Sequence, residues 1–265
     1  MNAERRPAVI TEKAAEYLKR IGVSPDAPLF TDLETLKMLQ YSHVTHVPYE
    51  NLDVLSGTPI RLDTDSLFDK IVRRNRGGYC FELNGLFNAL LVSMGFETQN
   101  LFARFLRGSA GGIPMRRHRV MRVFLPEGEF VTDVGTGAKA PRFPVKIEEN
   151  AVSEQFGEKY RFIKNDVFGW VLQDLSETTG EFADMFAFRD ETAFEVDYTA
   201  ASFWCEKHPE SPFAAKEMLS LKTQTGRITL DGSVFRIFDG AAVTVRELSD
   251  SEKAGVIRDY FNISI

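Results

Sequence analysis

A cysteine at the start of an apolar segment is the first residue of this sequence that could do chemistry. Cys80 stands in RGGYCFELNGLFNALLVSMG, where apolar residues recur at helical spacing until Gly95 supplies a stop. This pattern predicts a helix with Cys80 in its first turn, where free backbone N–H groups and the helix dipole favour a thiolate. Gly77 and Gly78 would let a substrate approach without obstruction. A free cysteine in an apolar helix is usually a core residue, but a core cysteine needs no preceding glycine pair, so we predict a nucleophile.

A histidine and an aspartate on one predicted hairpin could activate this cysteine. A thiolate nucleophile works with a nearby histidine, and that histidine needs an acceptor on its second ring nitrogen. His118 opens the run HRVMRVFL, and Asp133 lies near the end of the returning run EFVTDV. A two-residue loop at 126–127 would pair position 118 with position 135, which makes Asp133 the same-face diagonal neighbour of His118. We therefore predict a Cys80, His118 and Asp133 triad.

The other three histidines lack such a partner. His43 and His46 lie on or just after a predicted helix, and we interpret both as structural. His208, in KHPESPF, is a predicted loop residue with no carboxylate at a useful spacing. His118 is therefore the histidine expected to act with the thiolate.

Helices are predicted in the first third of the chain, ahead of and including the cysteine segment. Cap residues stand at Thr11, at Thr31 or Asp32, and at Thr64 or Asp65, each before a stretch with helical spacing. These helices would carry the nucleophile.

Strands are predicted from Thr98 onward, where the pattern changes to alternation. The runs QNLFARFL, RVMRVFL and EFVTDV predict an antiparallel sheet, and the stretch 141–159 is the best candidate for an irregular excursion. ITLDG and VFRIF predict two more strands, and Ser249 with Glu252 marks the start of a final helix. The middle of the chain thus reads as a sheet and the end as a small α/β unit.

Composition and charge exclude several classes of protein. The chain has 265 residues, 43% of them apolar, and can bury a core without disulfides. Cys80 and Cys205 are too few for a secreted framework and lack the spacing of a zinc site, so we expect a reducing, cytoplasmic location and no metal. No apolar run is long enough for a signal peptide or a membrane span. A net charge of -6 disfavours nucleic acid, although a basic patch lies between Arg104 and Arg122.

The order of the motifs resembles a known family of enzymes. HVPYENLDVLSGTPIRLD, then RRNRGGYCFELNGLF, then a histidine, then VTDVG is similar to the arylamine N-acetyltransferase family in order and spacing. The likeness covers most of residues 40–137, and a weaker likeness continues through FWCEKHPESPF to GRITL. Cys80, His118 and Asp133 fall on the Cys-His-Asp triad of that family.

The resemblance implies a fold and a reaction. The fold would be α+β in a cysteine-protease-like arrangement of three domains: a helical domain over 1–95, an antiparallel β-barrel domain over 96–200 and a small α/β lid domain over 201–265. The reaction would be ping-pong. Cys80 would attack acetyl-CoA, a co-substrate rather than a tightly bound cofactor, CoA would leave, and an arylamine or arylhydrazine deprotonated by His118 would take the acetyl group.

Further site residues follow from the same resemblance. Glu50 in PYENL and Arg76 in RGGYC look like the buried ion pair of the family, which ties the second helical segment to the catalytic loop. The loop RGSAGGIPMRRH offers glycine amides, Gly112 among them, together with Arg116 and Arg117 for the pyrophosphate or 3′-phosphate of CoA.

Four other positions complete the expected substrate contacts. By resemblance, Trp204 and Ser211 flank CoA. Tyr49 and Thr136 would line the acceptor pocket, and both stand where the family commonly has phenylalanine. Threonine in place of phenylalanine predicts a wider and more polar acceptor pocket.

Three alternatives use the same residues differently. An amide synthase that closes macrolactams would share the triad and transfer a carrier-bound acyl chain to an aryl amine. A cysteine hydrolase, either a protease or transglutaminase-like, would use the triad without CoA. A non-catalytic binding module would be expected to show damage at Cys80, His118 or Asp133, and all three are present.

Overall fold

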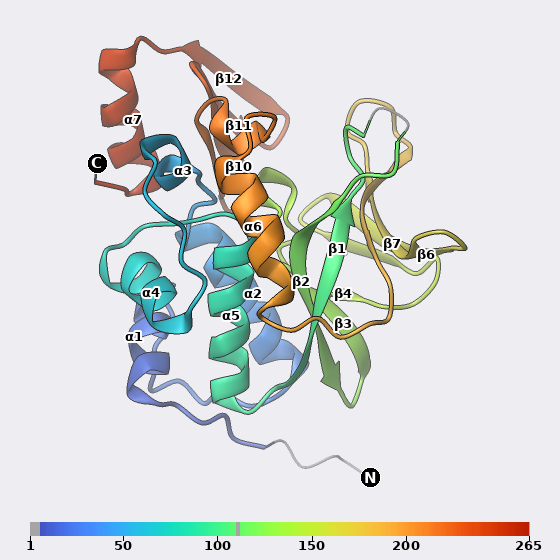
Figure 1. Ribbon diagram of the computed structural model, residues 1–265. Helices are drawn as coiled ribbons and strands as arrows, with labels where there is room; N and C mark the ends of the chain where they lie inside the picture. The colour runs from blue at the N-terminus through green and yellow to red at the C-terminus, as the bar shows by residue number, and fades with distance from the viewer. Residues whose placement is uncertain (1–5, 110–111, 265) are drawn as a thin grey trace.

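The structure is a computed structural model that describes residues 6–109 and 112–264. Within these residues the chain is α+β, with helices first, a large antiparallel sheet next, and a smaller sheet with a helix at the end (Figure 1). The predicted fold class is confirmed. Ala110 and Gly111, in the loop expected to bind CoA, lie outside the described residues. None of the described helices is long and apolar enough to cross a membrane.

The first part of the chain is helical, as predicted. Thr11 and Asp32 each accept a hydrogen bond from a backbone N–H of the first turn, so both act as N-caps. The next capped helix begins one residue earlier than expected, because Asp63 rather than Thr64 or Asp65 is the cap. The helices are α1 (Glu12–Arg20), α2 (Leu33–His46), α3 (Leu52–Ser56), α4 (Thr64–Phe68), the π-helical η1 (Asp69–Arg73) and α5 (Cys80–Met94).

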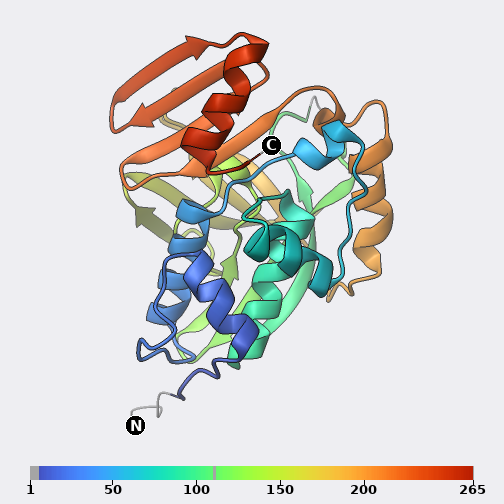
Figure 2. The same cartoon turned by 90° about the vertical axis from the view of Figure 1, so that its left-hand side faces the viewer.

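Helix α5 is the central element of the helical part. It packs against α1 and α4 on one side and against the large sheet on the other (Figures 1 and 2). Tyr79 is its N-cap, and the Glu82 carboxylate accepts a hydrogen bond from the Tyr79 N–H, which closes the first turn. Gly95 ends it in the left-handed conformation with φ 96°. Cys80 is therefore the first residue of a buried helix, in agreement with the sequence prediction.

In the described part of the chain, eight strands form one antiparallel sheet in the order β4-β3-β2-β1-β8-β7-β6-β5. Strand β4 also contacts β6, so the ends of the sheet approach each other in a barrel-like curl. The strands are β1 (Glu97–Phe105), β2 (Arg116–Leu125), β3 (Gly128–Thr132), β4 (Val145–Lys146), β5 (Val152–Gln155), β6 (Glu158–Asn165), β7 (Gly169–Leu175) and β8 (Phe182–Phe188). The predicted irregular stretch 141–159 thus contains two short strands and the start of a third.

The hairpin of β2 and β3 has the predicted register. Leu125 pairs with Gly128 and Met121 pairs with Thr132, which leaves residues 126–127 as the turn. The chain then leaves the sheet at Asp133 and forms a short 3-10 turn, η2 (Gly137–Lys139). This hairpin brings residue 133 back beside residue 118.

The last part of the chain is a four-stranded antiparallel sheet of β12-β11-β10-β9, with α7 packed on one face (Figure 2). Ser249 and Glu252 form the predicted capping box of α7. The outer strands β9 and β12 were not predicted, and α6 crosses the expected domain boundary at residue 200. The elements are α6 (Asp197–Lys207), the 3-10 turn η3 (Pro212–Ala214), β9 (Met218–Lys222), β10 (Gly226–Asp231), β11 (Val234–Asp239), β12 (Ala242–Glu247) and α7 (Asp250–Phe261).

The segment before α3 joins this sheet to the start of α5. Tyr49 and Ser220 exchange two backbone hydrogen bonds of 2.9 Å each. The backbone N–H of Glu50 donates to the carbonyl of Gly78 at 2.9 Å. The four-stranded sheet is therefore held against the residues that precede Cys80.

Candidate active site

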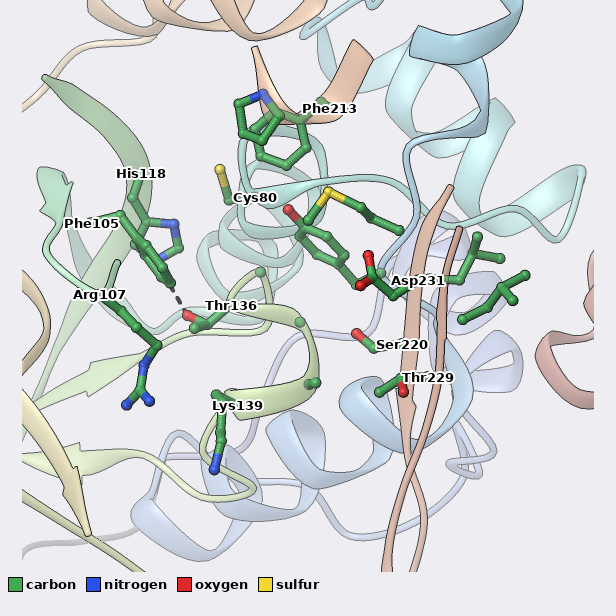
Figure 3. Close-up of a pocket in the computed structure, with 18 of the residues that line it drawn as sticks. Cys80, Phe105, Arg107, His118, Thr136, Lys139, Phe213, Ser220, Thr229 and Asp231 are labelled. Carbon is green, nitrogen blue, oxygen red and sulfur yellow. Dashed lines mark hydrogen bonds between the residues drawn. The ribbon is translucent and has the colours of Figure 1, made fainter. Parts of the chain in front are cut away.

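Cys80 lies at the wall of a cavity of about 470 Å³. Its side chain is almost fully buried, and its thiol donates a weak hydrogen bond to the backbone carbonyl of Arg117 at 3.6 Å. The lining of the cavity comes from α5, β1, β2, η2, η3, β9 and β10 and from loop residues beside them (Figure 3). The thiol thus faces a space large enough for a small substrate.

His118 and Asp133 are brought to the thiol by the β2 and β3 hairpin. His118 Nε2 and Asp133 Oδ2 are 2.8 Å apart, and both side chains are buried. Since Nε2 engages the carboxylate, the second ring nitrogen, Nδ1, remains for Cys80, whose side chain contacts the imidazole. The three residues of the predicted triad therefore lie in contact, in the order thiol, imidazole, carboxylate.

The charges in this group shift the pKa values of the imidazole and the carboxylate in opposite directions. Burial lowers the pKa of His118, but the charge and hydrogen bond of Asp133 and the contact with Cys80 outweigh burial and raise it to about 10. Burial raises the pKa of Asp133, but His118, Asn84 and Thr136 outweigh burial and hold it below its usual range. The imidazolium and the carboxylate are thus stabilised together near neutral pH.

Asp133 receives more hydrogen bonds than the sequence reasoning anticipated. Asn84 Nδ2 donates to Asp133 Oδ1 at 2.8 Å, the Gly135 N–H donates to the same oxygen at 2.7 Å, and the Thr136 hydroxyl donates to Oδ2. Asn84 also accepts a hydrogen bond from the N–H of Val134 at 2.8 Å. Asn84 was missed as a site residue, although its position four residues after Cys80 places it on the same face of the helix.

Glycines beside the triad permit close packing of the chain. A Cβ atom on Gly135 would lie 2.6 Å from the Cα atom of Cys80. A Cβ atom on Gly77 would lie 1.9 Å from the carbonyl oxygen of Pro48, and one on Gly78 would lie 2.7 Å from a carboxylate oxygen. Both residues are buried. The expectation that Gly77 and Gly78 clear a path for substrate is therefore wrong, because they make room for the protein itself.

A second group of buried charges lies behind the first turn of α5. Arg76 donates to Glu50 at 2.8 Å and to Asp53 at 2.9 Å. Lys70 Nζ lies 2.8 Å from Asp53 and 2.7 Å from Glu82, the carboxylate that closes the helix start. Burial raises the pKa of Glu82 to about 7, against the lowering effect of Lys70. The predicted Glu50 and Arg76 contact is thus part of a larger cluster that fixes the helix start.

Aromatic rings form much of the cavity wall. Phe105 lies edge-on to the His118 imidazole, with ring centroids 5.9 Å apart, and Phe213 stands across the cavity near Cys80 (Figure 3). Tyr49 and Thr136, the two positions expected to contact the acceptor, both line the cavity.

The residues expected to bind CoA are spread over several surfaces. Arg117 lines the cavity, and its guanidinium contacts the buried thiol of Cys205. Arg116 pairs with Glu191 at 3.2 Å and does not line this cavity. Gly112 is exposed and also lies outside the cavity wall. Of the five residues expected to bind CoA, Arg117 is the one that lines the cavity.

Trp204 and Ser211 are engaged with the protein rather than with the cavity. The Trp204 ring stacks on His208 with centroids 4.9 Å apart and planes at 18°. The Ser211 hydroxyl donates to the carbonyl of Cys205 and accepts from the N–H of Phe213. Within residues 6–109 and 112–264, no group of three or more His, Cys, Asp or Glu side chains could hold a metal ion.

Comparison with known proteins places this geometry in context. A family model described as N-acetyltransferase matches residues 32–265. An arylamine N-acetyltransferase from Mycolicibacterium smegmatis is 31% identical over 255 residues, covering 94% of this chain and 91% of the relative. The solved arylamine N-acetyltransferase from Salmonella typhimurium is similar with a TM-score of 0.90 and 27% identity, over 96% of this chain and 92% of that one. The Mycobacterium marinum arylamine N-acetyltransferase in complex with CoA has a TM-score of 0.86 and 30% identity, over 94% and 92%.

Proposed function

Because this chain belongs to the arylamine N-acetyltransferase family, we propose that it moves the acetyl group of acetyl-CoA to an arylamine or arylhydrazine through a thioester on Cys80. The family accounts for the activity, which is acetyl-CoA-dependent N-acetylation of arylamines. The observation that carries the proposed route is the contact of Cys80 with His118, and of His118 with Asp133, at the wall of one cavity.

In the first half of the reaction, the Cys80 sulfur attacks the carbonyl carbon of acetyl-CoA. A new carbon–sulfur bond forms, and the bond to the CoA sulfur breaks. The first-turn N–H of Glu82 already donates to the Tyr79 carbonyl at 3.0 Å, so the N–H groups of Cys80 and Phe81 are the ones that can stabilise the transient oxyanion. The proton that His118 holds goes to the departing CoA thiolate. Since one thioester replaces another, the step is close to thermoneutral.

In the second half of the reaction, the amine nitrogen attacks the acetyl carbon on Cys80. The carbon–nitrogen bond forms, the carbon–sulfur bond breaks, and the amine proton passes to His118. Asp133 stabilises the resulting imidazolium, consistent with a raised pKa of His118. Water must be kept from the intermediate, and the walls supplied by β9 and β10 cover the cavity on that side.

The substrate contacts are proposed from the cavity lining. Arg117 would meet a phosphate of CoA, and Tyr49 and Thr136 would meet the acceptor, since all three line the cavity. The M. marinum relative was solved with CoA, which supports CoA as co-substrate here. The other expected CoA contacts do not line this cavity and could act only on parts of CoA outside it; they are Gly112, Arg116, Trp204 and Ser211.

We also propose the three domains and the location expected from the sequence. The third domain, 201–265, would act as a lid over the helical domain, 1–95, and the barrel domain, 96–200; its strands β9 and β10 supply cavity residues. A cytoplasmic location agrees with two free cysteines, Cys80 and Cys205, of which the first must stay reduced to act.

Intact-mass spectrometry tests the route directly. The protein is mixed with acetyl-CoA alone, and an arylamine is added afterwards, with Cys80→Ser treated in parallel. We expect the wild type to gain one acetyl group that the amine removes, and the variant to gain none. An acetyl group that is lost as acetate at the same rate with and without amine would instead indicate a hydrolase. Absence of any adduct would reject the thioester intermediate.

A further inference from the structure

The basic stretch between Arg104 and Arg122 is only partly explained by the active site. Arg117 lines the cavity, and Arg122 pairs with Asp190 at 2.9 Å. Arg104 forms no ion pair with any described residue, and its Nη1 donates to the backbone carbonyl of Pro114 at 2.5 Å. A strand residue with a full positive charge is thus left without a counter-charge in the described part of the chain.

Arg104 lies directly opposite another arginine. In the pairing of β1 with β2, which run side by side in Figure 1, Arg104 is the partner of Arg116. Like charges in directly opposite positions destabilise a sheet. A third arginine, Arg189, follows β8 on the other side of β1 and lies two residues beyond Ala187, the partner of Arg104 in that strand. Three neighbouring strands therefore bring three positive charges together.

A bulge in β2 separates this group from the active site. Ala103 pairs with His118 and Arg104 pairs with Arg116, so Arg117 is the extra residue on β2. Arg117 lines the cavity beside the triad, whereas Arg104 and Arg116 line a different pocket of about 140 Å³. No described residue lines both spaces. The arginine group is thus a site apart from the nucleophile.

This second pocket is cationic. Its described lining consists of three arginines, Arg104, Arg116 and Arg189, and of apolar side chains, with no carboxylate. Arg189 donates to the carbonyl of Val167 at 2.7 Å. Arg116 pairs at 3.2 Å with Glu191, whose side chain is exposed, and exposed pairs contribute little. The described wall therefore carries more positive charge than the protein balances.

Two of these arginines have donors open to a ligand. Arg104 and Arg116 each use Nη1 alone, and their Nε and Nη2 atoms have no hydrogen-bond partner among the described residues. None of these four atoms is enclosed by the protein. The planar fork of a guanidinium matches two oxygens of a phosphate, and several arginines together suit its double negative charge.

The size of the pocket limits what can enter it. A volume of about 140 Å³ is below the roughly 300 Å³ of a pocket that encloses a whole small molecule. We propose that this pocket binds a single phosphate group, free or on a small molecule other than CoA, through Arg104, Arg116 and Arg189. Arg104 and Phe105 are successive strand residues and point to opposite faces of β1, so the phosphate lies on the face away from the cavity that Phe105 lines. The inference does not depend on the route through Cys80.

Equilibrium dialysis with radiolabelled inorganic phosphate measures this binding without any enzyme assay. At low ionic strength we expect the wild type to hold one phosphate per chain. Arg104→Gln and Arg189→Gln should each raise the dissociation constant of phosphate about tenfold, because each removes a charge-assisted contact. Arg104→Lys keeps the charge but loses the fork, and should have a smaller effect.

Matched variants control for fold and for general surface charge. Lys159→Gln removes an exposed barrel cation that pairs with Glu154 outside the pocket, and should bind phosphate as the wild type does. Arg189 is exposed, so Arg189→Gln tests the site even if Arg104→Gln folds poorly. Thermal unfolding of each variant shows whether the fold is retained, and added phosphate should raise the Tm of the wild type alone or of Lys159→Gln.

Competition then identifies the source of the phosphate group. If glucose 6-phosphate displaces the label at lower concentration than unlabelled phosphate does, the ligand is a phosphate ester. If it displaces the label at higher concentration, the ligand is free phosphate, and either result upholds the site. Absence of bound phosphate in the wild type, or equal weakening in Lys159→Gln, overturns it. Displacement of the label by CoA as effective as by phosphate itself would assign the arginines to CoA and also overturn the proposal.

Discussion

Two buried histidines, one in the helical core and one at the cavity, have opposite ionisation behaviour. His43 on α2 is 0% exposed and His118 on β2 is 2% exposed. Burial, helped by Arg20 and His46, lowers the pKa of His43 to about 3. Burial also acts on His118, but the charge of Asp133 reverses the result and raises its pKa to about 10.

The difference teaches what a histidine needs in order to act as a base. His43 hydrogen-bonds the Tyr17 hydroxyl at 2.7 Å, and its Nε2 has no hydrogen-bond partner among the described residues. It faces no cavity thiol and is uncharged at neutral pH, because its pKa is lowered to about 3. His118 has a carboxylate on one nitrogen and a thiol on the side of the other. A buried imidazole becomes chemically useful through these two contacts, and burial alone only keeps it neutral.

The largest effect on turnover is expected from replacing His118 by glutamine, with His43→Gln as the comparison. His118→Gln should lower turnover by about ten-thousandfold or more, because the thiol loses its base and its ion partner. His43→Gln should leave turnover per folded molecule unchanged and cost about 1–3 kcal/mol of unfolding free energy, since the Tyr17 hydrogen bond is disturbed. Steady-state kinetics and urea unfolding measure both. Equal loss of turnover in the two variants would show that His118 and His43 do not differ in their role in the reaction.

Removing the carboxylate should make His118 resemble His43. In Asp133→Asn the imidazole keeps its place but loses the charge that raises its pKa, so turnover should fall by about a thousandfold. The rate at which iodoacetamide alkylates Cys80, measured against pH, reports the ion pair of the Cys80 thiolate with the His118 imidazolium. The acidic limb of this profile, where the rate falls as the thiolate is protonated, should move to higher pH in the variant. A profile that does not move would show that Asp133 has no electrostatic role.

The ion cluster behind α5 provides a test of buried charge without chemistry. Arg76→Ala leaves Glu50 buried with one partner fewer and should cost about 3–5 kcal/mol, enough to unfold a marginal protein. Arg76→Lys keeps the charge and should recover part of this stability. Chemical denaturation of both variants makes the measurement. Normal stability together with normal turnover in Arg76→Ala would refute the role of the pair.

The pH dependence of stability should separate the two histidines. The folded pKa of His43 is below its usual 6.5, so its contribution is present above pH 6.5 and is lost as the pH falls toward 3. The folded pKa of His118 is above 6.5, so its contribution is present below pH 6.5 and is lost as the pH rises toward 10. In a plot of unfolding free energy against pH, His43 should therefore produce an acidic limb and His118 an alkaline limb. Each limb should amount to about 1–3 kcal/mol.

Each limb can be assigned with the matching glutamine variant. His43→Gln should flatten the acidic limb alone, and His118→Gln should flatten the alkaline limb alone. An acidic limb that persists in His43→Gln would have to come from other groups, such as the paired carboxylates.

The smallest effect concerns the hydroxyl of Thr136. Thr136→Val removes a donor from Asp133, so the carboxylate binds the imidazolium more strongly and the acidic limb of Cys80 alkylation should move to lower pH by about 0.3–0.5 units. Thr136→Ser retains the hydroxyl and should show no shift. If both variants shift equally, the shape of the side chain rather than its hydrogen bond is responsible.

Local patterns allowed a large part of this site to be predicted. The helix that begins at Cys80 and ends at Gly95 follows from spacing and punctuation, and the two-residue turn at 126–127 fixes how 118 and 133 meet. These features depend on neighbours in the sequence. The α+β fold class, which the family resemblance implied and these local patterns supported, is confirmed.

Contacts between distant segments leave no signal in local patterns, and the Glu50 and Arg76 pair was predicted only through the family resemblance. Asn84 reaches Asp133 across 49 positions, and Arg107 meets Asp174 across 67. The edge strands β9 and β12 were missed. Strand β9 has five residues, and the alternation of Val243, Thr244 and Val245 in β12 is too short to distinguish a strand from a loop. The tight packing of Gly77 on Pro48 was likewise hidden, since no pattern along the chain reports a close approach in space.

The backbone of Tyr49 has a consequence for how enzymes of this kind could diversify. Tyr49 exchanges hydrogen bonds with Ser220 on one side, and the next residue binds Gly78 on the other, so main-chain groups join the nucleophile segment to the outer wall. These bonds are independent of the side chain at position 49. A descendant of this chain can therefore change the ring that its substrate meets by one codon, at Tyr49, while inheriting the frame around the thiol unaltered.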